Sequence, residues 1–322
     1  MGKNTNLKDA KKAKNDEFYT RIEDVEKELK NYKDFFKGKK VLCNCNDGKI
    51  NGTWSAFAQY FSMNFEHLGL KKLTCVSYNE DGHGMKYVYQ GDKNGNHIAD
   101  DIEWEVSGLK GHGDFSDEEG QQMMQECDVV VTNPPFSLFR DFVTQVIEYG
   151  KKFLIIGNKN AITYKEIFPL IKDNKLWLGI TSPEDFVQPK GDKKKNMKGL
   201  TRWFTNIEHS IRNQPLDLYK KYNPKEYPKY DNYDAINVDK TSDIPMDYDG
   251  VMGVPISFLD KYCPTQFEIV GGFNRYKECD YENGLLCGTP TLYIDKNGTE
   301  IIWRGPTVNK KNCYFRILIR RK

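Results

Sequence analysis

The sequence predicts a doubly wound α/β fold with a mostly parallel sheet, and two observations lead to this prediction. Short apolar runs rich in β-branched residues, such as 41–45 and 128–132, alternate with stretches of helical periodicity. The strand–helix–strand order of residues 41–78 also predicts a right-handed crossover between neighbouring parallel strands. Ligands bind at the carboxyl ends of the strands in such sheets, so we expect functional residues directly after the apolar runs.

The elements before residue 80 follow this alternation. Residues 1–14 contain many lysines and few apolar side chains, so we expect a basic mobile tail. Apolar residues recur at helical spacing from 20 to 37, and Gly38 ends that helix. A buried strand, an aromatic-rich helix and a second strand are then expected at residues 41–45, 54–68 and 73–78.

Residues 83–108 interrupt the alternation. Two strand-like runs, 87–89 and 102–106, flank a tip rich in glycine and asparagine at 91–96, which predicts an inserted β-hairpin. The α/β alternation then resumes with a strand, a helix, a strand, a helix and a strand at residues 128–132, 138–149, 153–157, 163–172 and 175–180.

The pattern changes again in the C-terminal third of the chain. A loop rich in lysine and glycine occupies 188–199, and Asn297-Gly298 between apolar runs indicates a hairpin. A further helix is expected at 255–262. We therefore expect a main α/β domain at 15–206, which contains the insertion, and a C-terminal α+β region at 207–322.

Charge and hydropathy restrict the class of protein. The chain has 322 residues, and its 48 basic and 46 acidic side chains give a net charge of +2, so any nucleic-acid surface must be local. The mean hydropathy is −0.72, and no apolar run approaches the roughly 20 residues of a membrane span. The lysine-rich N-terminus lacks the apolar segment of a secretory signal. We expect a cytoplasmic protein without a membrane partner.

Cysteine and histidine usage predicts no metal site. None of the eight cysteines forms a Cys-x-x-Cys motif, and several lie in apolar runs, where cysteine acts as a small apolar residue. Disulfides are not expected in a cytoplasmic protein. None of the five histidines pairs with another at metal-ligand spacing.

The most informative segment is the end of the apolar run at 128–132. Asn133, Pro134, Pro135 and Phe136 follow it directly, and the two prolines stiffen the backbone. An exocyclic amino group of a nucleobase is a poor nucleophile, because its lone pair is delocalised into the ring. The Asn133 side-chain oxygen and the Pro134 carbonyl can accept its two hydrogens, and Phe136 can stack on the base. The simpler alternative is an ordinary turn.

The chain resembles the adenine-specific DNA methyltransferases of the EcoRI modification type, and Asn-Pro-Pro-Phe is the catalytic motif of S-adenosylmethionine-dependent amino methyltransferases. The matching segments are 14–20, 41–47, 68–73, 128–136, 202–206 and 253–260. They occur in the family's order. The resemblance implies a Rossmann-like methyltransferase domain, a C-terminal target-recognition region, and base flipping in specific duplex DNA.

The resemblance also implies a cofactor site for S-adenosylmethionine. It places Asp16, Phe18, Tyr19 and Thr20 at the methionine end, and makes Asn44, Asn46 and Asp47 the counterpart of the usual glycine-rich first loop. This loop has no Gly-x-Gly, so a polar turn is the alternative. Residues after the later strands complete the expected site. Asn79 and Glu80 are candidates for binding the ribose hydroxyls of the cofactor, with a solvated turn as the alternative. Asp114 and Phe115 are candidates for binding the adenine of the cofactor, with an ordinary loop aspartate as the alternative.

Substrate contacts follow from the resemblance and from charge. The family uses a second aromatic ring against the flipped base, for which we expect Trp203, with Phe204 in the core; both rings in the core is the alternative. The lysines of the 188–199 loop, including Lys193, Lys194 and Lys195, are expected on phosphates of double-stranded DNA. Residues beyond 206 and the inserted hairpin are expected to contact bases. A restriction endonuclease with the same site is a candidate partner, without a stable complex.

Two other functions remain open at this point. The same tetrapeptide serves methyltransferases that act on RNA adenine or on a protein glutamine. The missing glycines in the first loop are also compatible with a catalytically inactive, DNA-binding relative.

Overall fold

A computed structural model of the chain describes residues 19–50, 52–80, 82–187, 194–274, 279–294 and 300–322. The chain forms two compact units, one of residues 1–161 with 178–209 and one of residues 162–177 with 210–322. Residues 162–177 of the second unit lie within the range 15–206 that the sequence assigns to the main α/β domain.

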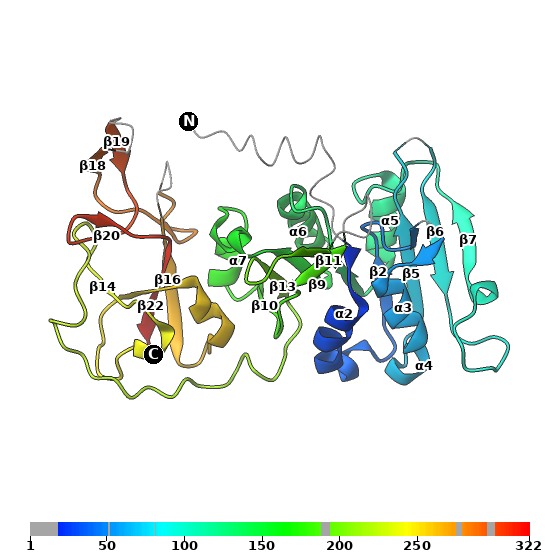
Figure 1. Ribbon diagram of the computed structural model, residues 1–322, viewed down its shortest axis with the longest axis horizontal. Helices are drawn as coiled ribbons and strands as arrows, with labels where there is room; N and C mark the ends of the chain where they lie inside the picture. Colours follow the sequence, from blue (N-terminus) through cyan, green and yellow to red (C-terminus); the bar gives the residue numbers. More distant parts are fainter. Residues whose placement is uncertain (1–18, 51, 81, 188–193, 275–278, 295–299) are drawn as a thin grey trace. The chain divides into compact units, whose positions relative to one another are not determined.

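An eight-stranded mixed sheet organises the first unit, in the order β10-β13-β9-β8-β2-β5-β6-β7 (Figure 1). Its four central strands are parallel, as the sequence predicts: β2 (Lys40–Cys43), β5 (Lys72–Ser77), β8 (Val129–Thr132) and β9 (Lys152–Asn158). The chain passes from β2 to β5 on one side, whereas β8 lies on the other side of β2. The loops after β2 and β8 therefore begin at the same edge of the sheet.

Antiparallel strands extend the sheet at both ends. β13 (Thr201–Thr205) pairs with β9, and β10 (Trp177–Leu178) lies beyond β13. At the other end, β6 (Met85–Tyr89) and β7 (Glu105–Gly108) form the expected inserted hairpin, and β6 pairs with β5. A separate three-stranded sheet joins β1 (Tyr19–Thr20), β11 (Asp185–Val187) and β12 (Lys194–Asn196).

Helices with one apolar face pack on this unit. The side chain of Ser55 caps α3 (Ala56–Met63) by accepting the Ala58 N–H at 3.1 Å. The expected helix at 20–37 is α2 (Ile22–Leu29), continued by the 3₁₀ segment η1 (Lys30–Phe36). The other helices of this unit are α4 (Phe65–Leu68), α5 (Glu118–Glu126), α6 (Phe139–Glu148) and η2 (Asp101–Glu103). A short hairpin of β3 (Lys49–Ile50) and β4 (Thr53–Trp54) follows the loop after β2.

The second unit contains a five-stranded sheet in the order β14-β15-β22-β16-β17. The five strands are β14 (Ile236–Asn237), β15 (Met252–Val254), β22 (Arg316–Arg321), β16 (Phe267–Phe273) and β17 (Leu285–Leu286). β22 is antiparallel to both of its neighbours. Buried side chains around this sheet include Tyr230, Phe273 and Leu318, which belong to one core cluster.

Shorter elements complete the chain. β18 (Thr291–Ile294) pairs antiparallel with β19 (Glu300–Trp303), and the expected turn at Asn297-Gly298 lies outside the described residues. The helix expected at 163–172 is only α7 (Phe168–Lys172), because Pro169 favours the first turn of a helix. The remaining elements are η3 (Lys159–Thr163), η4 (Thr241–Asp243), η5 (Ile256–Lys261), β20 (Thr307–Val308) and β21 (Lys311–Asn312).

One expectation about cysteine is wrong. Cys279 and Cys287 form a disulfide in the second unit. The two backbone hydrogen bonds between Asp280 and Leu285 close a tight loop, which brings the two cysteine side chains together.

Among the described residues, no helix is long and apolar enough to cross a membrane. Within the same residues, no three His, Cys, Asp or Glu side chains are grouped so that they could bind a metal ion.

Candidate active site

The site is built around the carboxyl end of β8. The apolar run 129–131 is fully buried, which fixes this strand in the centre of the sheet. Asn133 follows the last residue of the strand and is half-buried, and Pro134 is buried. Phe136 is half-buried and packs against the core of the unit. The motif therefore presents an amide and an aromatic ring at the end of a rigid strand.

Thr20 orients the carboxamide of Asn133. The Nδ2 atom of Asn133 donates a hydrogen bond to the Oγ1 atom of Thr20 at 3.1 Å. Thr20 and Tyr19 form β1, whose backbone pairs with Val187 and Phe186 of β11. Asp16 and Phe18 lie outside the described residues. The structure thus brings the expected cofactor-binding segment into direct contact with the expected catalytic motif.

A second contact connects the motif to the loop after β2. The hydroxyl of Thr132, directly before Asn133, donates to Oδ2 of Asp47. The same oxygen accepts the backbone N–H of Cys45 at 3.1 Å. Asp47 is only 4% exposed, and burial raises its pKa to about 7, although the two donors act in the opposite direction. A carboxyl group that titrates near neutral pH therefore lies between the two strand ends.

The loop after β2 is irregular but ordered. Asn46 adopts a left-handed conformation with φ of 62°, which asparagine tolerates better than most residues, and its Oδ1 accepts the Tyr78 N–H at 3.3 Å. Asn44 is 3% exposed, and among the described residues its Nδ2 has no hydrogen-bond partner. A buried amide donor of this kind fits a ligand that carries a carboxylate or hydroxyl oxygen.

The four remaining residues expected at the cofactor lie on two loops that contact each other. Asn79 and Glu80 are exposed after β5, and the backbone N–H of Asn79 donates to the carbonyl of His112 at 2.9 Å. The Oδ1 atom of Asp114 accepts from the N–H and the hydroxyl of Ser116. Phe115 is buried and packs edge-to-face on Phe142, with ring centroids 4.9 Å apart. This arrangement surrounds the carboxyl ends of β2 and β5 with polar groups.

The expectation that Trp203 faces a flipped base is wrong for this structure. Trp203 and Phe204 are both fully buried. Trp203 packs edge-to-face against Phe57, with ring centroids 6.2 Å apart, and Phe204 packs on Phe139 at 5.0 Å. Phe57 belongs to α3 and Phe139 to α6, so a helix covers each face of β13 at these two rings. Neither ring can stack on a base without disrupting the core.

The lysine loop is described only in part. Lys193 lies outside the described residues. Lys194 and Lys195 belong to β12, where their backbones pair with Val187 and Phe186. Thr132 is a residue of the candidate site that we did not single out from the sequence. Its signal was present, since it is the polar residue that ends an apolar run directly before Asn133.

Comparisons with known proteins agree along nearly the whole chain. A family model described as "Adenine-specific methyltransferase EcoRI" matches residues 6–322. The Type II methyltransferase M.EcoRI of Escherichia coli is 42% identical over 344 aligned residues, which cover 98% of this chain and 96% of that protein. The Type II methyltransferase M.MgeORF184P of Mycoplasma genitalium is 37% identical and covers 97% and 98%, respectively. M.MpnI of Mycoplasma pneumoniae, also named a Type II methyltransferase, is 40% identical and covers 81% and 83%. No solved structure was found to match the chain.

Proposed function

Because the chain belongs to the EcoRI family of adenine-specific methyltransferases, we propose that it methylates the exocyclic amino group of adenine in a specific sequence of duplex DNA. S-adenosylmethionine supplies an electrophilic methyl group for this reaction. The observation that carries the proposal is the hydrogen bond from Asn133 to Thr20 at the end of β8. It orients an amide toward the substrate beside the loop expected to bind the cofactor.

The chemistry requires acceptors rather than a strong base. The side-chain oxygen of Asn133 and the carbonyl of Pro134 accept the two amino hydrogens and localise the nitrogen lone pair. The nitrogen loses a proton readily once it is methylated. Pro135 stiffens the loop, and Phe136 stacks on the base. Flipping the adenine out of the duplex costs a few kcal/mol, and one stacking ring recovers about 1–3 kcal/mol of that cost.

The cofactor is proposed to bind across the carboxyl ends of β2 and β5. We regard this part of the sheet as the doubly wound, Rossmann-like arrangement in which ligands bind where the strand order reverses. The buried amide of Asn44 and the carboxyl of Asp47 contact the methionine part, together with the segment that contains Thr20. The other assigned contacts are Asn46, Asn79, Glu80, Asp114 and Phe115.

We assign the DNA contacts to two parts of the chain, a group of lysines and the second unit. The lysines at 193–195 contact phosphates, and the unit that contains residues 210–322 recognises the target sequence. We expect a cytoplasmic enzyme of a restriction–modification pair. A companion endonuclease would share the DNA site, and no stable complex with it is proposed.

One experiment tests the proposal. Purified protein is incubated with methyl-labelled S-adenosylmethionine and a library of duplex DNA, and methylated positions are mapped by sequencing. We expect label only on adenines within one short sequence. The Asn133→Ala variant, which keeps the backbone of the motif, should transfer label about 10²–10³ times more slowly than the wild type. In parallel incubations with RNA or with protein, label there and not in DNA would identify the alternative substrates, and cofactor binding without transfer to any of them would indicate an inactive relative.

A further inference from the structure

The inserted hairpin contacts the loop after β2 through the ring of Tyr87. A Cβ atom added to Gly48 would lie 2.4 Å from that ring and 2.4 Å from the hydroxyl of Ser77. The hydroxyl of Ser77 donates to the carbonyl of Lys49 at 3.1 Å. Any side chain at position 48 would displace Tyr87, so this glycine permits close packing between the loop and the insertion.

An aromatic cluster forms the second contact. Trp54 of β4 stacks on Trp104 of the insertion, with ring centroids 4.1 Å apart and an interplanar angle of 25°. Tyr87 packs edge-to-face on Trp54 at 5.3 Å. Trp104 is 6% exposed, so this stack is largely shielded from solvent. The short hairpin of β3 and β4, which follows the loop after β2, therefore packs against residues of the insertion.

Asp101 provides the third contact and carries a charge. Its Oδ2 accepts from Nζ of Lys49 at 2.5 Å, and its Oδ1 accepts from Nε1 of Trp54 at 2.7 Å. The hydrogen bond from Lys49 lowers the pKa of Asp101, and the bond from Trp54 adds to this effect. The ammonium of Lys49 also lies 4.7 Å from the centre of the Trp54 ring. One carboxylate thus connects both strands of the short hairpin.

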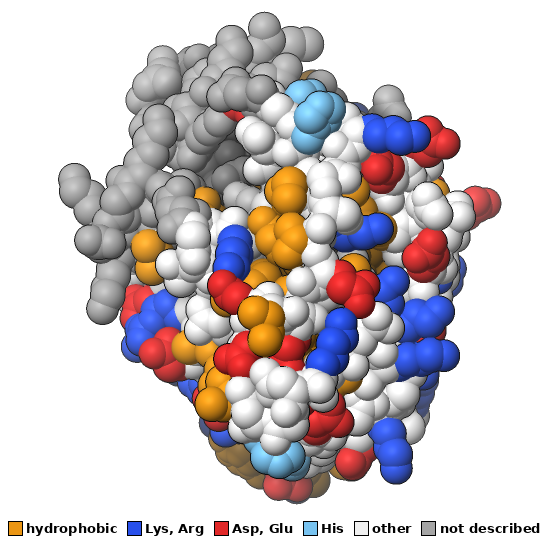
Figure 2. Space-filling view, turned by 90° about the vertical axis from the view of Figure 1, so that its right-hand side faces the viewer, with side chains coloured by type: hydrophobic (Ala, Val, Ile, Leu, Met, Phe, Trp, Pro, Cys, Tyr) orange, Lys and Arg blue, Asp and Glu red, His pale blue; other side chains and the backbone are white. Residues whose placement is uncertain are grey.

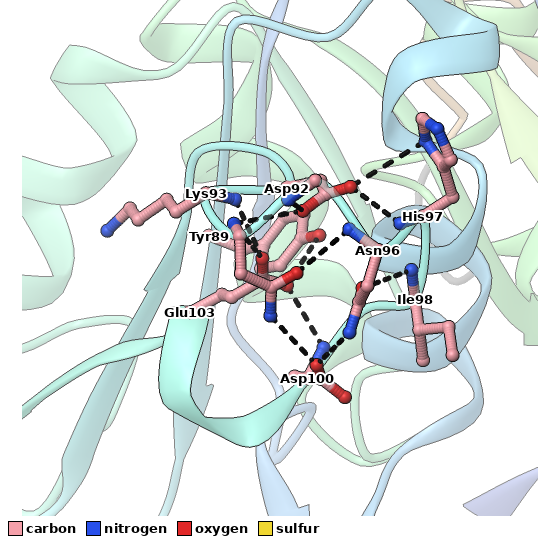
Figure 3. A network of polar contacts seen from close by, with 10 residues as sticks. Tyr89, Asp92, Lys93, Asn96, His97, Ile98, Asp100 and Glu103 are labelled. Carbon is pink, nitrogen blue, oxygen red and sulfur yellow. Dashed lines mark hydrogen bonds and ion pairs between the residues drawn. The ribbon is translucent and has the colours of Figure 1, made fainter.

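A polar network inside the insertion includes Tyr89, Asp100 and Glu103 (Figure 3). Glu103 is 1% exposed and accepts the backbone N–H groups of Lys93 at 2.7 Å and Asp100 at 3.0 Å. The hydroxyl of Tyr89 on β6 donates to the same carboxylate at 3.3 Å. This network therefore fixes the backbone on both sides of Asp101, at Asp100 and at Glu103.

The charge of the insertion does not suit phosphate binding. Figure 2 faces the side of the first unit that carries β7, and acidic and basic side chains are intermixed there. Within residues 83–108, Lys86 and Lys93 are outnumbered by acidic side chains, namely Asp92, Asp100, Asp101, Glu103 and Glu105. A segment that tracks the DNA backbone would carry the opposite balance.

We propose that the insertion at 83–108 positions the loop after β2 for S-adenosylmethionine, with Asp101 as its main positioning residue. This role rests on the proposed function. It also explains how a first loop without Gly-x-Gly keeps a defined shape. Contacts from Tyr87, Trp104 and Asp101 replace the conformational restriction that a glycine-rich turn would provide, and they reduce the entropy that the loop loses on binding.

The test compares two acidic residues of the same insertion. Asp101 forms an ion pair with Lys49 in the short hairpin of β3 and β4. Glu105 instead forms an ion pair with Lys93 inside the insertion, at 3.0 Å. Exposed ion pairs contribute up to about 1 kcal/mol, so we expect Asp101→Ala to raise the dissociation constant and the KM for S-adenosylmethionine about fivefold. The KM for DNA and the melting temperature should stay close to those of the wild type. Glu105→Ala should leave all four quantities unchanged.

A conservative variant and the wild type complete the design. Asp101→Asn keeps an acceptor for Trp54 but loses the charge for Lys49, so its affinity for the cofactor should fall between those of the wild type and Asp101→Ala. Unchanged cofactor affinity in Asp101→Ala, or equal losses in Asp101→Ala and Glu105→Ala, would overturn the inference. A rise in the KM for DNA alone would assign the insertion to DNA contact instead. Failure of the wild type to bind S-adenosylmethionine would refute the proposed function itself.

Discussion

Replacement of Asp47 by asparagine should remove a large pH dependence of stability. The carboxyl of Asp47 is buried and accepts hydrogen bonds from Thr132 and Cys45. Burial raises its pKa to about 7 in the folded protein, compared with about 3.9 in an unfolded chain. Between these two values the folded protein keeps a proton that the unfolded chain has released. The free energy of unfolding therefore falls as pH rises through this window and levels off above it.

The magnitude follows from the two pKa values. Raising the pH from 5 to 8 should lower the free energy of unfolding of the wild type by about 2.5 kcal/mol through this group alone. The asparagine side chain of the variant does not titrate, and its carbonyl can still accept from the Thr132 hydroxyl. We expect the stability of Asp47→Asn to lack this decrease, so the two proteins should converge at low pH and diverge at high pH.

Urea denaturation at several pH values between 5 and 8 measures the effect. Asp234→Asn is a matched control, because the Asp234 side chain is 92% exposed and pairs only with Lys229 among the ion pairs seen in the described residues. Its stability should change with pH as that of the wild type does. Parallel pH profiles for Asp47→Asn and the wild type would refute the argument, since they would mean that the carboxyl of Asp47 titrates at its ordinary value.

Further outcomes are expected at the catalytic motif, at the buried ring and in the lysine loop. Asn133→Ala should lower turnover by about 10²–10³ with cofactor affinity retained, because we propose that the amide binds the substrate and not the cofactor; a methyl-transfer assay measures turnover, and calorimetry measures affinity. Thr20→Val removes the acceptor for Asn133 and should lower turnover about tenfold, with the KM for DNA little changed. Trp203→Phe should keep the fold and the fluorescence increase of 2-aminopurine at the target position, whereas Trp203→Ala should lose about 3–5 kcal/mol of stability. If the Trp203→Phe variant folds but does not show that increase, Trp203 is again the candidate for the ring that stacks on the base. Replacing 193–195 with alanine should flatten the dependence of DNA affinity on salt, and equal slopes would exclude these lysines from phosphate contact.

The sequence was sufficient to predict the central parallel strands of the sheet and the position of Asn133 directly after one of them. The apolar runs of β2 and β8 are buried on both faces, and runs of this kind are diagnostic of interior parallel strands. The position of Asn133 followed, because a polar residue directly after such a run must lie at the strand end. The contact between Asp47 and Thr132 could not be predicted, because it depends on β2 and β8 being adjacent and in register.

Trp203 shows where sequence periodicity is insufficient. Alternation along β13 predicts that Trp203 and Phe204 lie on opposite faces, and the structure agrees. Alternation does not tell which of the faces is open. That depends on which elements cover the strand, and both rings lie in the core here. The disulfide between Cys279 and Cys287 was missed for a related reason, since a tight loop between the two residues leaves no spacing motif.

The orientation of the catalytic amide depends on a strand that is distant in sequence. With Nδ2 of Asn133 donating to Thr20, the side-chain oxygen lies on the other branch of the amide, and an oxygen is the atom that an amino group needs as an acceptor. Thr20 is placed by β1, which is held by pairing with β11. The segment expected to line the cofactor therefore also holds the amide of the motif, through the contact of Thr20 with Nδ2 of Asn133.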